Sequence, residues 1–370
     1  MTIAFVDLKR QDAPIREALD SAMRRVAERG SFILGDDVAA FEEAFARYVG
    51  VRHAVGVSSG LAALELILRG YDIGPGDEVV VPAHTFVASA ACVSLVGATP
   101  TFADVDDTFL LDPSSVEAAV SPRTRAIIAV HLYGRPAAMD ALRLVADRHG
   151  LVLIEDAAQA HGAELDGVRV GGIGDAAAFS FYPSKNLGAS GDAGAVTTND
   201  DALAARISAM RNCGQFEKNV HSVMPCNHRM DTLQAAVLGV RLGQLDAWNA
   251  ARRRVATWYR EALADAPVVL PPYDDARRRS VWHLFVIRTP ERNHLAASLA
   301  SAGVATGVHY PLPVHRQPFY REAHHGAVAF PCAERHCETI LSLPMHPNVT
   351  EDQVGYVAAA VKAAMTSSVR

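Results

Sequence analysis

Lys185 is the residue whose surroundings point most directly to covalent chemistry. It follows a short apolar run and lies in a loop with Pro183, Gly188, Gly191 and Gly194. Small residues let a bulky planar group approach the backbone. A lysine that loses water also loses basicity and becomes a nucleophile toward carbonyl groups. Taken alone, an ordinary solvated loop lysine remains the simpler interpretation.

A carboxylate ends another apolar run, Val152–Asp156. Parallel sheets bind ligands at the carboxyl ends of their strands, so Asp156 could pair there with a protonated ring nitrogen. Pyridoxal phosphate needs such a partner, because its protonated ring is the electron sink. Asp156 as the N-cap of a following helix is an equally good interpretation.

Two more segments follow apolar runs. Ser58–Gly60 lies between a strand-like and a helix-like segment, where free backbone N–H groups could bind an anion, although it matches neither the Walker nor the dinucleotide motif. Phe86 follows the run Glu78–Pro82 and could stack on a flat ligand. In isolation, a plain turn and a core aromatic are the simpler interpretations. Together with Lys185 and Asp156, these features favour a single cofactor site.

Short apolar runs must form the elements that carry these residues. Seven such runs are typical of strands buried on both faces of a mainly parallel sheet: His53–Val57, Glu78–Pro82, Thr99–Asp104, Ala126–Val130, Val152–Asp156, Ala177–Phe181 and Gly194–Thr198. Helix-like segments separate most of them: Leu61–Gly70, Val87–Val96 and Ala137–Arg148. Alternating strands and helices predict an α/β fold.

The pattern changes after Asp200. Helices and one strand are expected at Asp201–Met210, Met230–Leu245, Trp248–Leu263, Val281–Arg288 (the strand) and Asn293–Ala302. Thr350 and Gln353 form a capping-box pattern that opens a last helix, to about Met365. We expect a large cofactor-binding domain at 1–245, with a helical N-terminal segment, and a small α+β domain at 246–370.

Composition limits the classes of partner. The chain has 370 residues with 35 Lys and Arg against 41 Asp and Glu, a net charge of −6, which argues against bulk attraction for nucleic acid. The five cysteines are odd in number and show no CxxC spacing, which argues against a disulfide framework and a zinc site. The start of the chain lacks a secretory apolar region, and no apolar run is long enough to cross a bilayer. We expect a cytoplasmic protein without a metal, a membrane or a nucleic-acid partner.

The chain resembles the DegT/DnrJ/EryC1/StrS family of pyridoxal-phosphate sugar aminotransferases over nearly its whole length. The segments that carry the resemblance are Phe32–Gly35, Phe41–Glu42, Ser59–Gly60, Glu155–Gln159, Ser180–Asn186, Asn227–Asp231, Leu233–Ala236, His309–Pro311 and Leu343–Pro344. The segment around Lys185 is the most specific of them. The resemblance implies the aspartate aminotransferase-like fold type I, with a seven-stranded, mainly parallel sheet.

The resemblance also implies the chemical roles of three residues. Lys185 forms the Schiff base with the cofactor and later moves the proton between the cofactor and the substrate carbon. Asp156 binds the pyridine nitrogen, and Gln159 lies near the phenolic oxygen. Some relatives carry His in place of this lysine and act as sugar dehydratases, so Lys185 favours transamination.

The remaining cofactor contacts are implied in the same way. Ser180 and the backbone at Gly60 and Leu61 hold the phosphate, and Phe86 stacks on the ring. Asn227 reaches the phosphate from a partner subunit, which implies a homodimer with shared active sites.

The resemblance to the 3-ketosugar subgroup implies a substrate class. The expected reaction moves an amino group from L-glutamate to a nucleotide-linked ketosugar, preferably a dTDP-3-keto-6-deoxyhexose, to give an aminosugar nucleotide. Tyr182, Arg229, His309 and Tyr310 are candidates for contacting this substrate, with His84 as a further candidate near its diphosphate. A loop histidine bonded to backbone is an alternative for His309. A 4-ketosugar, a cyclitol ketone, and a non-catalytic cofactor-binding regulator remain open as alternatives.

Overall fold

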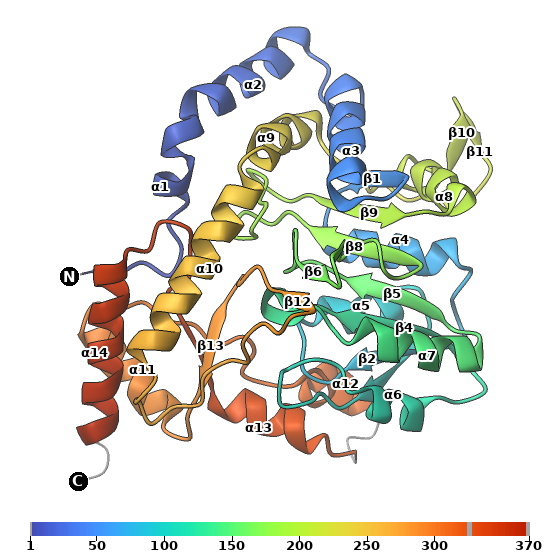
Figure 1. Cartoon of the computed structure of the whole chain (residues 1–370). Helices are drawn as coiled ribbons and strands as arrows, with labels where there is room; N and C mark the ends of the chain where they lie inside the picture. The colour runs from blue at the N-terminus through green and yellow to red at the C-terminus, as the bar shows by residue number, and fades with distance from the viewer. Residues whose placement is uncertain (1, 324–327, 368–370) are drawn as a thin grey trace.

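The computed structural model describes residues 2–323 and 328–367. Among these residues, the largest sheet has seven strands in the order β1-β9-β8-β5-β4-β2-β3 (Figure 1). The strands are β1 (His53–Val57), β2 (Glu78–Pro82), β3 (Thr99–Ala103), β4 (Thr124–Val130), β5 (Val152–Asp156), β8 (Ala176–Ser180) and β9 (Gly194–Thr198). Only β9 runs against its neighbours β1 and β8. The predicted seven-stranded, mainly parallel sheet is confirmed.

Alternating side chains of each strand enter two different cores. In β4, Ile128 and Val130 face one core, whereas Ile127 and Ala129 face the other. Such strands are apolar at nearly every position, which is why their runs stand out in the sequence. The helices that cover one face are α4 (Gly60–Gly70), α5 (Ala88–Leu95) and α8 (Asp201–Arg211). Those on the other face are α3 (Asp36–Val49), α6 (Pro113–Ala119) and α7 (Met139–His149).

The N-terminal segment is helical and packs beside α9 (Thr232–Leu242). It consists of α1 (Leu8–Asp12), a 3-10 turn η1 (Ala13–Ile15) and α2 (Arg16–Arg29). The two helices expected at Met230–Leu245 and Trp248–Leu263 are present with shifted bounds, because α9 ends at Leu242 and α10 (Leu245–Ala262) begins after a short break. The break contains Gly243, which caps α9 in a right-handed conformation.

Helix α10 leads from the sheet-bearing body to a second body, where it packs against α14 (Glu351–Ser367) (Figure 1). There β13 (Phe285–Arg288) pairs antiparallel with β14 (Ile340–Leu343), and α11 (Arg292–Ser301) covers them. The core of this second body also contains Ile3, which bridges to Val304. The division at residue 245 stays a prediction.

Two expectations in this body have clear outcomes. The capping box is present, because the Thr350 backbone N–H donates to Gln353 Oε1 at 3.0 Å and the Gln353 N–H donates to Thr350 Oγ1 at 3.3 Å. The expected strand Val281–Arg288 begins only at Phe285. Its first residues turn aside to pair with the 3-10 turn η2 (Leu132–Gly134): Val281 N–H donates to Gly134 O at 2.9 Å.

The remaining elements are short, apart from α13, and lie between these bodies and on their surfaces. They are β6 (Glu164–Leu165), β7 (Val168–Arg169), β10 (Gln215–Glu217), β11 (Val220–His221), β12 (Arg278–Arg279), η3 (Val314–Arg316), α12 (Pro318–Ala323) and α13 (Pro331–Thr339). Strands β10 and β11 form a hairpin that projects from the body (Figure 1). Among the described residues, no helix combines the length and apolar character needed to cross a membrane.

Candidate active site

The carboxyl ends of β1, β5 and β8 lie at one edge of the sheet, where the antiparallel strand β9 begins. Gly194, the first residue of β9, lies against the turn after β1, because a Cβ there would be 2.4 Å from the carbonyl carbon of Ser59. The segments that the sequence singled out at Ser58–Gly60, Asp156 and Lys185 therefore follow strands that end at the same edge.

A cradle for an anion forms at the start of α4. Ser59 caps the helix by accepting the Ala62 N–H at 3.1 Å. Gly60 lies so close to the end of β8 that a Cβ there would be 2.7 Å from Ser180 Cβ. The first N–H groups of a helix have no acceptor within it, so Gly60 and Leu61 present free donors beside the Ser180 hydroxyl. The structure thus brings Gly60, Leu61 and Ser180 together.

Asp156 is held as a buried, oriented carboxylate at the end of β5. It is 6 % exposed, and its Oδ2 accepts the Ser89 hydroxyl at 2.7 Å. Its Oδ1 accepts the Ala158 backbone N–H at 3.2 Å. No helix begins in the loop that follows, so Asp156 is not a helix N-cap among the described residues. Ser89, on α5, was missed because nothing in the sequence relates it to β5.

The amine of Lys185 lies in a partly desolvated position. The side chain is partly covered, and the loss of water lowers its pKa from 10.5 to about 8, an effect that the negative charge of Asp156 partly opposes. A lysine with this pKa has a useful neutral fraction near neutral pH and can attack a carbonyl carbon. This environment does not fit an ordinary solvated loop lysine.

Gln159 links the loop after β5 to an aromatic side of the site. Its Oε1 accepts the Tyr133 backbone N–H at 2.6 Å, and its Nε2 donates to the Tyr310 hydroxyl at 3.1 Å. Tyr310 in turn lies beside Phe86, with the ring centroids 5.5 Å apart. Phe86 is 52 % exposed, so it does not fill the core. Burial raises the pKa of Tyr310, which therefore stays protonated.

His309 also approaches Lys185, but its ring already has two other partners. It stacks on Phe5 at 5.6 Å, and its Nδ1 lies 2.9 Å from Ser342 Oγ. Burial, together with the charge of Lys185, lowers the pKa of His309 to about 4. Its partner is thus a side chain rather than backbone. His84 is buried, lies 3.3 Å from the Tyr133 hydroxyl, and has its pKa lowered to about 4 by burial.

The remaining candidates lie farther out. Tyr182 is 56 % exposed, and Asn227 is exposed on the segment beside β1. Arg229 pairs through its backbone with Val57 at the end of β1, and its guanidinium donates to Asn212 Oδ1 at 3.0 Å.

Tyr133 was not found from the sequence, although it contacts both bodies. It has a left-handed φ of 59°. Its hydroxyl donates to the His309 carbonyl, and its own carbonyl accepts the His283 N–H at 2.9 Å. The only sequence signal for a turn at Tyr133 is Gly134, and a single glycine is too common to identify a functional residue.

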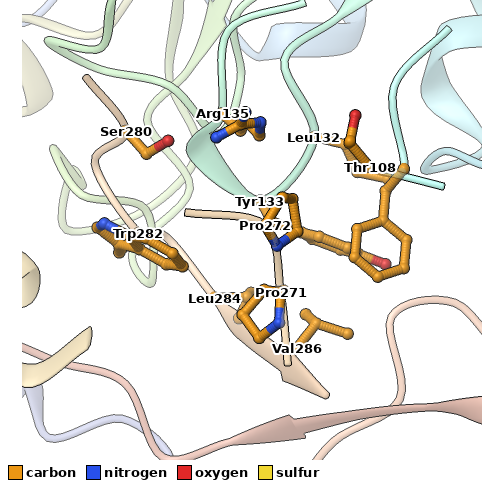
Figure 2. A pocket seen from close by; sticks show the side chains of 11 residues that line it. Thr108, Leu132, Tyr133, Arg135, Pro271, Pro272, Ser280, Trp282, Leu284 and Val286 are labelled. Carbon is orange, nitrogen blue, oxygen red and sulfur yellow. The ribbon is translucent and has the colours of Figure 1, made fainter. Parts of the chain in front are cut away.

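A small pocket lies behind this turn rather than at Lys185 (Figure 2). Its lining includes Tyr133 and Arg135 from the turn, and Trp282 and Leu284 from the segment that enters the second body. None of the residues predicted for the cofactor lines it. We interpret it as packing space at the junction of the two bodies.

These residues fit pyridoxal phosphate. The glycine–serine cradle suits its phosphate, the buried carboxylate of Asp156 suits its ring nitrogen, and the amine of Lys185 suits its aldehyde. Fold and site therefore define a pyridoxal-phosphate-dependent aminotransferase.

Comparison with known proteins places the chain within this class. Residues 14–362 match the DegT/DnrJ/EryC1/StrS aminotransferase family, and the chain belongs to that family. It is 48 % identical to the "Erythromycin biosynthesis sensory transduction protein EryC1" of Saccharopolyspora erythraea, over 98 % of this chain and 100 % of the relative. It is 47 % identical to a "dTDP-3-amino-3,4,6-trideoxy-alpha-D-glucose transaminase" of Streptomyces venezuelae, over 97 % of this chain and 95 % of the relative.

A solved structure is similar to this chain over nearly its whole length. The crystal structure of S. venezuelae DesV in complex with a ketimine intermediate superposes with a TM-score of 0.95, at 47 % identity, and covers 98 % of each chain.

Proposed function

We propose that this enzyme transfers an amino group from L-glutamate to carbon 3 of a dTDP-linked 3-keto-6-deoxyhexose. The observation that carries the proposal is the joint placement of the Lys185 amine, the Asp156 carboxylate and the Gly60–Ser180 cradle at one sheet edge. The name of the S. venezuelae relative, 47 % identical, supports carbon 3 and the dTDP carrier.

Each residue has a defined task in this proposal. Bound pyridoxal phosphate supplies the electron sink and carries the amino group between donor and acceptor. Asp156 would hold a proton on the ring nitrogen, and Gln159 would interact with the phenolic oxygen. Lys185 Nζ binds the aldehyde and moves the proton to and from the substrate carbon, for which its lowered pKa is suited.

Other residues are proposed to bind the cofactor phosphate and the sugar substrate. The N–H groups of Gly60 and Leu61 and the Ser180 hydroxyl would hold the phosphate, and Phe86 would cover the ring. Tyr182, Tyr310 and His309 are the proposed contacts for the sugar or its diphosphate. Arg229 would have to leave Asn212 to take part, so it is the weakest of the substrate candidates.

A panel of acceptors tests the substrate. The purified enzyme is given dTDP- and UDP-linked 3-keto and 4-keto sugars, with glutamate as donor, and 2-oxoglutarate and aminosugar are measured together. We expect turnover with the dTDP-3-keto sugar. Turnover only with 4-keto sugars or a cyclitol ketone would contradict the proposed position of the amine. Cofactor binding without any turnover would instead fit a regulator.

We further propose a homodimer in which Asn227 completes the partner's phosphate site. Asn227 is exposed in the chain, and so are large apolar side chains near the site, such as Phe86 and Tyr182. Water contact with such surface is unfavourable, and a symmetric partner would cover it.

Subunit mixing tests the shared site. Lys185→Ala and Asn227→Ala homodimers are each measured, then unfolded together and refolded. If Asn227 acts across the interface, each mixed dimer has one intact site, and about one quarter of wild-type activity returns in a random mixture. Activity no higher than the sum of the two homodimers would contradict the shared site.

A cytoplasmic location is also part of the proposal. The cysteines Cys92, Cys213, Cys226, Cys332 and Cys337 are all free, which is typical of a reducing compartment. Cell fractionation with an antibody to the chain would test it, and recovery from a secreted fraction would contradict it.

A further inference from the structure

The side chain that follows Lys185 makes a buried network of hydrogen bonds. Asn186 is 1 % exposed. Its Nδ2 donates to Asn249 Oδ1 at 2.9 Å and to the Val281 carbonyl at 2.9 Å. Its Oδ1 lies 3.1 Å from His283 Nδ1. The residue next to the reactive lysine is thus tied to α10 and to the segment that enters the second body.

Backbone carbonyls fix the direction of these hydrogen bonds. The Val281 carbonyl can only accept, so Asn186 must present its NH₂ group there and its oxygen to His283. His283 Nδ1 must therefore carry a hydrogen. Burial lowers the pKa of His283 strongly, with the charge of Lys185 as a further cause, so the ring is neutral and Nε2 is the unprotonated nitrogen.

The network continues to the other side of the site. Asn249 is 1 % exposed, and its Nδ2 donates to the His161 carbonyl at 2.8 Å. His161 lies in the loop between β5 and β6, which begins directly after Asp156, the predicted partner of the ring nitrogen. One chain of hydrogen bonds thus joins the loop of Lys185, helix α10 and the loop of Asp156. Each amide in it must be satisfied, because a buried polar group without a partner is costly.

We propose that Asn186 and the Nδ1–H form of His283 are positioning residues that hold Lys185 in its reactive place. The proposal rests on the role of Lys185 in the proposed function. The positioning role is a further claim: the place of the Lys185 amine would depend on the hydrogen bond between Asn186 and His283, which joins the two bodies of the chain. Neither residue touches the reacting atoms, and both act through the backbone at Lys185.

The pKa of the Lys185 amine reports its position, because the surroundings of the amine set that pKa. Asp156 is the anion that raises the pKa of the amine, whereas loss of water lowers it. Burial lowers the pKa values of His161, His283 and His309, and the positive charge of Lys185 lowers them further. A lysine that leaves this position gains water, so its pKa should rise from about 8 toward 10.5.

The test measures that pKa in the enzyme freed of cofactor. The rate at which apoenzyme captures pyridoxal phosphate is followed against pH, and each adduct is fixed with borohydride and located by peptide mapping. Only the neutral amine reacts, so a rise of one pKa unit lowers the capture rate at neutral pH about tenfold. We expect at least this loss for Asn186→Ala and His283→Leu.

A conservative variant isolates the hydrogen bond. His283→Asn keeps an N–H donor near the position of Nδ1 and should restore a capture profile close to that of the wild type. In the wild type, ¹⁵N NMR should find the Nδ1–H form of His283, and the Nε2–H form would contradict the proposal. Leu299→Ala is the matched control, because Leu299 is fully buried in the second body and outside the network.

The outcomes distinguish a failure of the proposed function from a failure of the positioning role of Asn186 and His283. If the wild type captures the cofactor at no lysine, or at one other than Lys185, the proposed function fails. If the wild type captures it at Lys185 with a pKa near 8 but Asn186→Ala and His283→Leu behave like Leu299→Ala, only the positioning role fails. Equal profiles for His283→Asn and His283→Leu would also overturn it.

Discussion

Gly60→Ala is the substitution for which the structure predicts the clearest loss of cofactor affinity. An added Cβ would lie 2.7 Å from Ser180 Cβ and 3.2 Å from Ser180 Cα. Neither atom can move by a side-chain rotation, so the start of α4 and the end of β8 must separate. The backbone of Gly60 is not left-handed, and therefore the contact, rather than a strained φ, causes the cost.

The size of the effect follows from overpacking. Inserting a methyl group into a tight contact costs about 1–3 kcal/mol. If this whole cost appears as a wider phosphate cradle at Gly60, Leu61 and Ser180, cofactor binding weakens by the same free energy. The dissociation constant for pyridoxal phosphate should then rise about 5- to 150-fold. Absorbance titration of the apoenzyme measures this constant directly, and urea unfolding of the apoenzyme shows whether the fold is affected as well.

Two comparisons make the prediction refutable. Gly239 lies in α9 with no atom within 4 Å of an added Cβ, so Gly239→Ala should leave the affinity unchanged. In a Ser180→Gly background, Gly60→Ala should cost less, because the nearest atom has been removed. An unchanged affinity in Gly60→Ala, or an equal loss with and without Ser180 Cβ, would refute the reasoning.

Three further substitutions test other parts of the site. Glu155 is buried and accepts the N–H groups of Gly171, Ile173 and Gly174, so Glu155→Ala, which leaves three donors without their acceptor, should lower the free energy of urea unfolding by roughly 3–5 kcal/mol. Ser89→Ala removes a donor to a carboxylate, and cofactor titration should give about a tenfold higher dissociation constant, equivalent to ~1.4 kcal/mol. Burial lowers the pKa of His161 from 6.5 to about 3, so protonation of the unfolded chain destabilises the wild type as pH falls. This cost reaches roughly 2 kcal/mol near pH 5, and His161→Leu should lose less unfolding free energy on acidification than the wild type does.

The strands of the main sheet could be predicted because burial on both faces leaves a continuous apolar signature. In the second body this signature found only one of the two strands: the apolar run that contains β13 was predicted, whereas β14 was not. Strand β14 has four residues and pairs with β13 across about fifty positions of sequence, so its identity depends on a contact that no local pattern encodes. The expected strand Val281–Arg288 is present only from Phe285 for a related reason, since the Val281 N–H donates to Gly134 O in the turn η2.

The site divides in the same way. Residues that bear the chemistry, such as Lys185 and Asp156, follow buried strands and lie in recognisable motifs. Residues that hold them, such as Ser89 and Asn186, owe their place to partners far away in the chain: Ser89 lies 67 positions from Asp156, and Asn186 lies 97 from His283. Hydrogen bonds of this kind depend on tertiary packing, and a single sequence does not reveal them.

The site has a buried inner part, around Asp156 and Asn186, and an exposed outer part, around Phe86 and Tyr182. We expect the inner part to serve the cofactor and the outer part to serve the sugar. The inner part is buried and satisfied within one chain: Asp156 and Asn186 both have short hydrogen bonds to neighbouring elements. The outer part leaves Phe86 and Tyr182 more than half exposed. Changes in the inner part should therefore alter cofactor affinity and the titration of Lys185 with little effect on the KM for the sugar. Changes in the outer part should alter KM first, because there the nucleotide sugar and the proposed partner subunit would meet the chain.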